Sequence, residues 1–359
     1  MLAFAGSVGQ SRLLGRHSQK QMTIRRIAAN LGVSPSTVSL ALRESPKIPR
    51  STRERVRLEA ERLGYRPDAR LTELMSHLRL SRAPHAEACF GVISFYDTPR
   101  PWERSLHLSR IYESMLRCAH HLGYRLEPIW LHAPGMNYRR FREVLDARGI
   151  HGLLCFGSPN IHESFPSELD HYAIVTVGLS IETPLHRITS HFYSDLWRTL
   201  VKVQELGYRR PGLVLGVYED DRSAHAFASA YFGWCEHTFG RPGLLPLLRL
   251  ERLEESILLR WLGEHHPDVI VFVHLYDFLP ELVHTLSSNG IRVPEDLGVA
   301  AVSHILEGTT LSGMQQNQEL MGAWAVELLV ARIMHQDLGI STHPRMEMVE
   351  SEWVDGKSL

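Results

Sequence analysis

The sequence contains no run of 18 apolar residues, so we expect no segment that spans a membrane as a helix. Only four of the 359 residues are cysteines, and these lie far apart at Cys89, Cys118, Cys155 and Cys235. This spacing favours reduced thiols over a disulfide or metal framework. The apolar residues 1–6 form a short stretch with no basic region before it, which is not typical of a signal peptide. We therefore expect a cytoplasmic protein.

Motifs of metal centres and of common enzymes are also missing. The 21 histidines include the adjacent pairs His120-His121 and His265-His266, but no HExxH or CxxC spacing occurs. The sequence has no G-x-S-x-G motif and no glycine loop that would cradle a phosphate. We expect no catalytic residues, no metal and no cofactor.

The overall net charge of −1 conceals two differently charged parts. Residues 1–82 hold 16 lysines and arginines against 6 aspartates and glutamates, a balance of +10. The remaining residues hold 23 against 34, a balance of −11. A basic part attached to an acidic body is typical of a phosphate-binding module joined to a domain that does not bind nucleic acid, although a solvated basic tail is the alternative.

The texture of the sequence divides the chain into four parts. Residues 1–21 lack periodicity and are predicted to be a disordered extension, with Met22 as an alternative start. Residues 22–68 show three short helical patterns, and residues 69–84 form a hinge. From residue 85 to 359, apolar strands alternate with amphipathic helices, which predicts parallel sheets covered by helices on both faces. We expect two lobes, roughly 85–185 and 186–308, with crossovers near 308–318 and in the C-terminal segment.

The first two helical patterns are separated by a short turn. The first begins at the N-cap Thr23 and carries an apolar stripe that ends at Leu31. Gly32 suits the turn, and the second pattern opens with Ser34 as N-cap and Pro35 at the first helical position. This is the helix-turn-helix arrangement, whose second helix enters the major groove of DNA.

A third helix is expected to start at a capping box, Ser51–Glu54, and to end at Gly64. With its apolar positions inward, the second helix would present to DNA the residues Pro35, Ser36, Thr37, Ser39, Leu40 and Arg43. The alternative is a structural three-helix bundle with a solvated basic face.

Three segments carry a resemblance to a known family: Thr23–Ser39 (TIRRIAANLGVSPSTVS), Thr52–Val56 (TRERV) and Leu63–Ala69 (LGYRPDA). They resemble the head of the lactose/galactose repressor (LacI) family of transcriptional regulators. The resemblance implies that the recognition-helix positions are Ser34, Pro35, Ser36, Thr37 and Ser39, and that the contacts to the DNA backbone come from Thr23, Lys47, Thr52 and Tyr65.

Two positions in this region carry separate expectations. Leu40 stands where most relatives place an arginine, and leucine can offer only apolar contact to a base. By its spacing from Tyr65, Leu74 matches the hinge leucine that relatives wedge into the minor groove. Because Leu71, Leu74, Met75 and Leu78 also form a helical apolar stripe, the alternative is a longer amphipathic helix packed against protein.

The resemblance continues more weakly to the C-terminus, through Leu206–Arg210 and Asn289–Leu297. It implies a type I periplasmic-binding-protein fold, in which two lobes clamp a small ligand and closure is transmitted to the hinge. The expected fold class is therefore an all-α helix-turn-helix head joined to a two-lobed α/β sensor.

Ligands of open α/β sheets lie beyond the carboxyl ends of strands. This rule indicates Tyr96–Asp97, Gly157–Ser158, Tyr218–Asp221, His274–Asp277 and Ser303–His304. The family's sugar-binding groups match poorly, since its arginine falls on Ala226 or Phe227 and its aspartates fall on serine and histidine. The effector is then either not a common hexose or is held by different residues. The candidate effector residues are Tyr96, Asp97, Tyr276, Asp277, Ser303, His304 and Gln316, the last from the resemblance.

We expect a homodimeric, sequence-specific regulator, most simply a repressor, that binds a pseudo-palindromic operator. Its effector would be a small molecule such as a carbohydrate or a derivative. A solute-binding protein and an enzyme on a doubly wound fold are the alternatives. The basic head argues against the first, and the missing catalytic constellation argues against the second.

Overall fold

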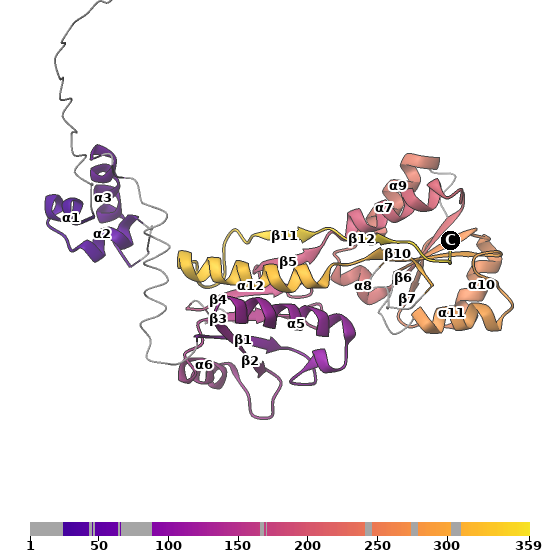
Figure 1. The fold of residues 1–359 in the computed structure, drawn as a ribbon, viewed down its shortest axis with the longest axis horizontal. Helices are drawn as coiled ribbons and strands as arrows, with labels where there is room; N and C mark the ends of the chain where they lie inside the picture. Colours follow the sequence, from indigo (N-terminus) through magenta and orange to yellow (C-terminus); the bar gives the residue numbers. More distant parts are fainter. Residues whose placement is uncertain are drawn as a thin grey trace, which may run out of the picture. The chain divides into compact units, whose positions relative to one another are not determined.

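The computed structural model describes residues 24–42, 45, 47–63, 65, 88–165, 169, 171–240, 246–273, 279–302 and 310–359. The chain divides into two compact units, Met1–Arg82 and Ala83–Leu359, which we call the head and the sensor (Figure 1). In the described part of the chain, no helix is long and apolar enough to cross a membrane. The four cysteines are unpaired, with Cys155 and Cys235 buried.

Three helices make up the described part of the head, as predicted. They pack around a small apolar core that includes Ile27, Val38 and Val56, none more than 1% exposed. The turn between the first two helices contains Gly32 at φ +67°, a left-handed conformation that glycine adopts without strain. The helices are α1 (Ile24–Leu31), α2 (Pro35–Leu42) and α3 (Arg50–Arg62).

The capping predictions for the head had different outcomes. Ser34 caps α2 as expected, since its Oγ accepts a hydrogen bond from the Thr37 N–H at 3.1 Å. The capping box at Ser51–Glu54 is wrong, because α3 begins at Arg50 with Pro49 before it and no side-chain cap. The Pro49 carbonyl accepts the N–H groups of both Thr52 and Arg53 at 3.0 Å, so the helix starts two residues earlier than it would with Ser51 as its cap. The predicted cap Thr23 and the helix end at Gly64 lie outside the described residues.

The first lobe of the sensor is built on a parallel sheet with strand order β11-β5-β4-β3-β1-β2. Successive residues of β1 face opposite sides: Val92 joins the core under α5 and α12, and Ile93 joins the core under α6. The elements are β1 (Ala88–Ser94), β2 (Tyr124–Trp130), β3 (Gly152–Cys155), β4 (Ala173–Val177), β5 (His186–Ser190), β11 (Met346–Val349), the short helix η1 (Pro101–Glu103), α5 (Leu106–His121), α6 (Tyr138–Ala147) and α12 (Gln318–His335).

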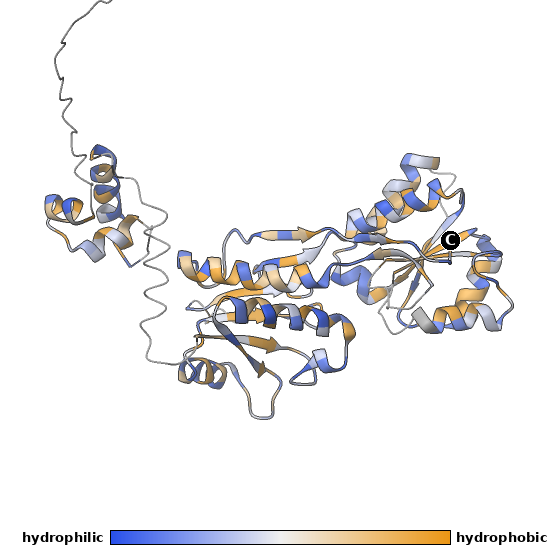
Figure 2. Ribbon diagram, viewed as in Figure 1, coloured by the Kyte–Doolittle hydropathy of each residue, from blue (hydrophilic) through white to orange (hydrophobic). Residues whose placement is uncertain are grey.

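The second lobe has a sheet with order β12-β10-β9-β8-β6-β7, parallel except for the antiparallel pair β10–β12. Leu213 of β6 packs under α7 and α9, and Val214 packs on the opposite side under α10 and α11. Figure 2 shows the apolar strands of both lobes between helices of mixed polarity. The elements are β6 (Pro211–Gly216), β7 (Leu248–Leu250), β8 (Val269–Val273), β9 (Gly298–Val302), β10 (Ser312–Gln315), β12 (Glu352–Val354), α7 (Phe192–Glu205), α8 (Val217–Arg222), α9 (Ala226–Phe239), α10 (Glu255–His265) and α11 (Leu279–Ser288).

The chain passes between the lobes at three places: from β5 into α7, from β10 into α12, and from β11 into β12. Two of these crossovers are joined by a hydrogen bond from the His191 N–H to the Val349 carbonyl at 3.2 Å. The first sheet extends beyond the expected lobe boundary at residue 185, because β5 belongs to it. The lobes are therefore joined by neighbouring backbone segments, which we call the inter-lobe hinge.

The strands and helices that the sequence pattern predicts for the sensor occur within a few residues of their predicted bounds. The predicted strands are 90–96, 124–131, 152–156, 173–179, 213–217, 269–273 and 299–302, and the predicted helices are 106–122, 141–148, 196–206, 224–239, 254–266, 280–289 and 319–334. The strands β5, β7, β10, β11 and β12 and the helix α8 were not predicted. Strand β5 has the polar sequence HRITS, yet every residue in it is buried. Arg187 is accommodated there because its guanidinium donates to the carbonyls of Leu185, Ile181 and Thr183.

Candidate nucleic-acid interface and effector cleft

The recognition surface of the head is the outer side of α2 and the residues just before it. Ser34, Pro35 and Ser36 are exposed, and Thr37, Ser39 and Leu40 are partly exposed. Val38 and Ala41 lie on the inner side, at 0% and 2% exposure. Leu40 is not among the apolar side chains that pack against the head core.

The hydroxyl groups at the start of α2 form a small cluster. The Oγ of Ser34 lies 2.8 Å from both the Ser36 Oγ and the Thr37 Oγ1. A hydroxyl can donate to or accept from a base edge, so these residues can contact more than one type of base. The apolar inner side of α2 holds the helix on the head core, while the hydroxyl groups of its outer side remain accessible. A helix that contacts bases in the major groove of DNA requires this arrangement.

The residues expected to contact the DNA backbone have different surroundings. Lys47 is exposed. The N–H of Thr52 is already bonded to the Pro49 carbonyl, so its hydroxyl is the group that could contact phosphate. The Tyr65 ring packs against the head core. Thr23, Arg43 and Leu74 lie outside the described residues.

Part of the positive charge of the head is neutralised within α3. Arg57 pairs with Glu54 at 2.7 Å and with Glu61 at 3.0 Å. Arg62 pairs with Glu59 at 2.6 Å, and the hydrogen bond from Arg62, followed by that from Asn30, lowers the pKa of Glu59 to about 2. These glutamates are already subtracted in the balance of +10, so the pairs leave that net charge unchanged but make Arg57 and Arg62 less available to phosphate.

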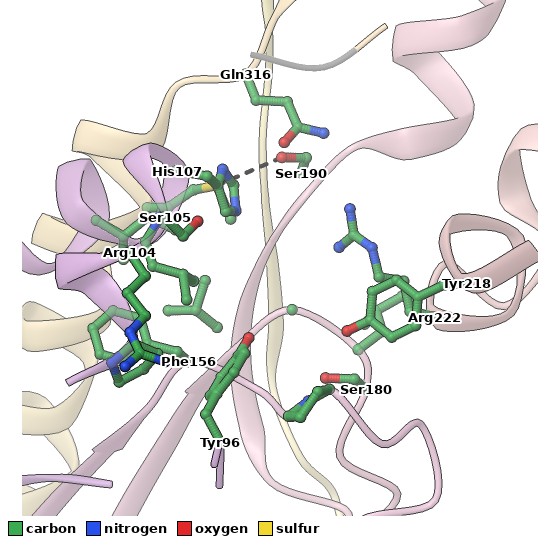
Figure 3. A pocket seen from close by; sticks show the side chains of 18 of the residues that line it. Tyr96, Arg104, Ser105, His107, Phe156, Ser180, Ser190, Tyr218, Arg222 and Gln316 are labelled. Atoms are coloured by element: carbon green, nitrogen blue, oxygen red, sulfur yellow. Dashed lines mark hydrogen bonds between the residues drawn. The ribbon is translucent and has the colours of Figure 1, made fainter. Parts of the chain in front are cut away.

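A cavity of about 460 Å³ lies in the sensor and is lined by both lobes (Figure 3). The first lobe contributes Tyr96, Asp97 and Phe156, the second contributes Tyr218 and Arg222, and the crossovers contribute Ser190 and Gln316. This volume falls within the roughly 300–1,000 Å³ of small-molecule pockets. The cavity can hold one small ligand that contacts both lobes at once.

The sequence-predicted effector residues are distributed unevenly around this cavity. Tyr96, Asp97 and Gln316 line it, as does Tyr218. Ser158 is not among the lining residues but supports them, since its carbonyl accepts a hydrogen bond from the Tyr218 hydroxyl at 2.9 Å. The remaining candidates lie outside the described residues: Tyr276, Asp277, Ser303 and His304.

Sequence reasoning missed Arg222, which extends from α8 into the cavity (Figure 3). Its guanidinium lies 5.5 Å from the centre of the Phe192 ring and 5.9 Å from that of Tyr218. The arginine was sought in the next helix, at Ala226 or Phe227, because α8 was not predicted. The spacing of four between Tyr218 and Arg222 was the available signal, because residues four apart share one helix face. Arg104 and His107 of the first lobe also line the cavity and were not among the predicted residues.

The inter-lobe hinge contains a buried carboxyl group. Asp195 of α7 is 0% exposed, and its Oδ2 accepts a hydrogen bond from the Ser351 Oγ at 2.8 Å. Its Oδ1 has no hydrogen-bond partner among the described residues. Burial raises the pKa of Asp195 to about 7, against the opposing hydrogen bond from Ser351. Of the neighbouring charges, Glu350 raises this pKa, whereas Arg198 and His191 lower it.

In the described residues, no group of three or more histidine, cysteine, aspartate or glutamate side chains could hold a metal ion. The fold and the two sites together define a helix-turn-helix DNA-binding protein with a two-lobed ligand-binding sensor.

Comparison with known proteins supports both parts. Residues 23–68 match the bacterial regulatory proteins of the lacI family, and residues 202–359 match the periplasmic binding protein-like domain. The chain belongs to the LacI family and is a DNA-binding transcriptional regulator.

Two curated relatives resemble different lengths of the chain. The HTH-type transcriptional regulator RafR of Escherichia coli is 47% identical over 53 residues, which are 15% of this chain and 16% of RafR. The HTH-type transcriptional repressor PurR of Haemophilus influenzae is 20% identical over 348 residues, covering 91% of this chain and 95% of PurR. Among solved structures, a Lac repressor dimer bound to operator and the anti-inducer ONPF is similar with a TM-score of 0.56. It is 16% identical, with coverage of 94% of this chain and 99% of the repressor chain, and this likeness shows the fold.

Proposed function

We propose that this regulator is a homodimeric repressor whose two heads bind a pseudo-palindromic operator. The exposed hydroxyl face of α2, held on an apolar core, carries this proposal. A two-fold symmetric protein places its two recognition helices in half-sites about one helical turn apart or a multiple of it. In the Lac repressor structure, a dimer of the same fold is bound to operator.

The cavity supports a second part of the proposal, that a small molecule changes operator affinity. A ligand held by Tyr96 on one lobe and Tyr218 on the other favours one relative position of the lobes. The lobes are joined by three crossovers, about which one lobe can rotate relative to the other. Such a rotation would move the first lobe, whose chain is preceded by residues 69–84. The function is one of binding, without a catalytic step, in the cytoplasm at the nucleoid.

The proposal also includes a role for one residue and a class of effector. Leu74 is proposed as the minor-groove wedge, with the amphipathic helix of residues 71–78 as the alternative. A small molecule, such as a carbohydrate or a carbohydrate derivative, is proposed as the effector.

Selection of binding sites from random DNA by the full chain tests the DNA-binding part. We expect an enriched pseudo-palindrome, and Ser36→Ala should change the preferred bases or weaken binding. Ser229→Ala, an exposed serine on α9 of the sensor, serves as the matched control and should select the same sites as the unaltered chain. Recovery of no common motif would contradict the proposal, and so would identical motifs and affinities for the Ser36 variant.

A further inference from the structure

The side chains that line the cavity differ in number between the two signs of charge. Among the described lining residues, Asp97 is the only carboxylate, and it is exposed at the rim. Arg222 and His107 are half-buried, whereas Arg104, on the first lobe, is exposed as Asp97 is. The described part of this lining therefore carries more positive than negative charge.

In the described part of the chain, no hydrogen bond or ion pair to a carboxylate holds the guanidinium of Arg222. Its Nε is buried and has no hydrogen-bond partner among the described residues, and the rings of Phe192 and Tyr218 hold it from the side. Glu219, on the same helix, is 3% exposed, and both of its carboxylate oxygens also lack a described partner. Burial raises the pKa of Glu219 and favours its neutral form, although the positive charge of Arg222 acts in the opposite direction. Such an arginine can bind an anion through its planar fork.

Three long helices begin at this cavity. Ser105, the N-cap of α5, lines it, as do Phe192, the first residue of α7, and Met321 in the first turn of α12. The amino end of a helix carries roughly half a positive charge. The field of the helix ends therefore has the same sign as the charge of Arg222.

The remainder of the lining is apolar or neutral. Tyr96, Phe156, Leu108 and Val177 line the cavity from the first lobe, and we call them the first-lobe wall. Gln316, which is 2% exposed, adds an amide near Ser190 (Figure 3). Thr98, Ser105 and Ser180 also add hydroxyl groups to the lining, so it is Arg222 and the helix ends that favour an acid over a neutral sugar. An anionic group with an apolar or cyclic body matches both halves of the cavity.

We propose that the cleft ligand is a small carboxylate, bound through its carboxylate group by Arg222 and Gln316 with its body against the first-lobe wall. This inference rests on the proposed effector function of the same cavity. A carboxylate of this kind can be a sugar acid or an aromatic acid, and the test separates the two.

The test uses matched acid and neutral probes with the full chain. The pairs are D-glucuronate with D-glucose, and cinnamate with cinnamamide. Thermal unfolding is followed by tryptophan fluorescence, which reports on the sensor because all seven tryptophans lie there. We expect at least one acid to raise the melting temperature and its neutral partner to have little effect. The pair that responds identifies the body of the ligand as a sugar or an aromatic ring.

Variants connect this response to the guanidinium. Arg222→Gln should weaken binding of the acid at least about tenfold, because it removes a charge-assisted hydrogen bond. Arg222→Lys should retain part of the affinity, because it keeps the charge and loses the fork. Arg252→Gln, which removes an exposed arginine outside the cavity on the same lobe, should bind like the unaltered chain.

Equal stabilisation by acid and neutral probes, no response to either acid, or unchanged acid binding in Arg222→Gln would overturn the carboxylate proposal. The effector function is judged separately, by operator affinity. If D-glucose or cinnamamide stabilises the protein and changes operator affinity, the cavity is an effector site for neutral ligands. If a carboxylate binds through Arg222 without changing operator affinity, the carboxylate proposal stands and the effector function fails.

Discussion

Replacing Asp195 by asparagine should remove a pH-dependent contribution to the stability of the sensor. Burial raises the pKa of Asp195 to about 7 in the folded protein, from an ordinary value of 3.8. The native state therefore keeps a proton that the unfolded chain releases, and the contribution of this group to the free energy of unfolding falls as pH rises from about 4 to about 7. At about 1.4 kcal/mol per pH unit, the loss amounts to roughly 4–5 kcal/mol and is complete above the folded pKa.

Asparagine is neutral at every pH and keeps an oxygen that can accept the hydrogen bond from Ser351. The variant should have nearly the stability of the unaltered chain at pH 4 and exceed it by about 4–5 kcal/mol at pH 8. Urea unfolding followed by tryptophan fluorescence measures this difference in the sensor. Glu264→Gln, which changes an exposed carboxylate on α10, is the control and should follow the unaltered chain. A difference between the Asp195→Asn variant and the unaltered chain that stays constant from pH 4 to pH 8 would refute the reasoning.

Two predictions concern the head. Leu40→Arg should change the preferred base at one symmetric position of each half-site, with about 1–3 kcal/mol of discrimination, and identical selected motifs would place this side chain away from the bases. Lys47→Ala should reduce the salt dependence of operator binding by about one unit of slope, because an exposed lysine neutralises a phosphate. Arg57→Ala should leave this slope unchanged, since Arg57 is paired with Glu54 and Glu61, and an equal effect of both variants would contradict this assignment.

The parts predicted well from the sequence are those whose local pattern and burial agree. The all-apolar strand Val269–Val273 and the helix-turn-helix with Gly32 and Ser34 are examples. Strand β5 was not predictable in the same way, because its polar residues are buried by partners distant in the fold or in the adjoining loop. Pro49 displaced the start of α3 because its carbonyl, rather than a serine side chain, accepts the first free N–H groups.

Two sequence arguments pointed to the cavity: the rule that ligands lie beyond the carboxyl ends of strands, and the family resemblance. Tyr96 and Gln316 were identified by that rule and by the resemblance, and the structure brings them to one cavity. Arg222 depends on the six-residue helix α8, which is too short for its periodicity to be recognised. The convergence of three helix ends on the cavity is a property of the topology, and no local pattern records it.

The most direct test of the account is the affinity of the full chain for a selected operator and for a scrambled sequence of the same composition, measured by fluorescence anisotropy at increasing salt. The account predicts about a thousandfold or greater preference for the operator. It also predicts a loss of operator affinity of at least roughly a thousandfold between about 50 and 200 mM salt, as counterions compete for the phosphates. Equal affinity for the two sequences, or an operator affinity that changes less than about tenfold over this range, would contradict the claim that the head is a sequence-specific DNA-binding surface.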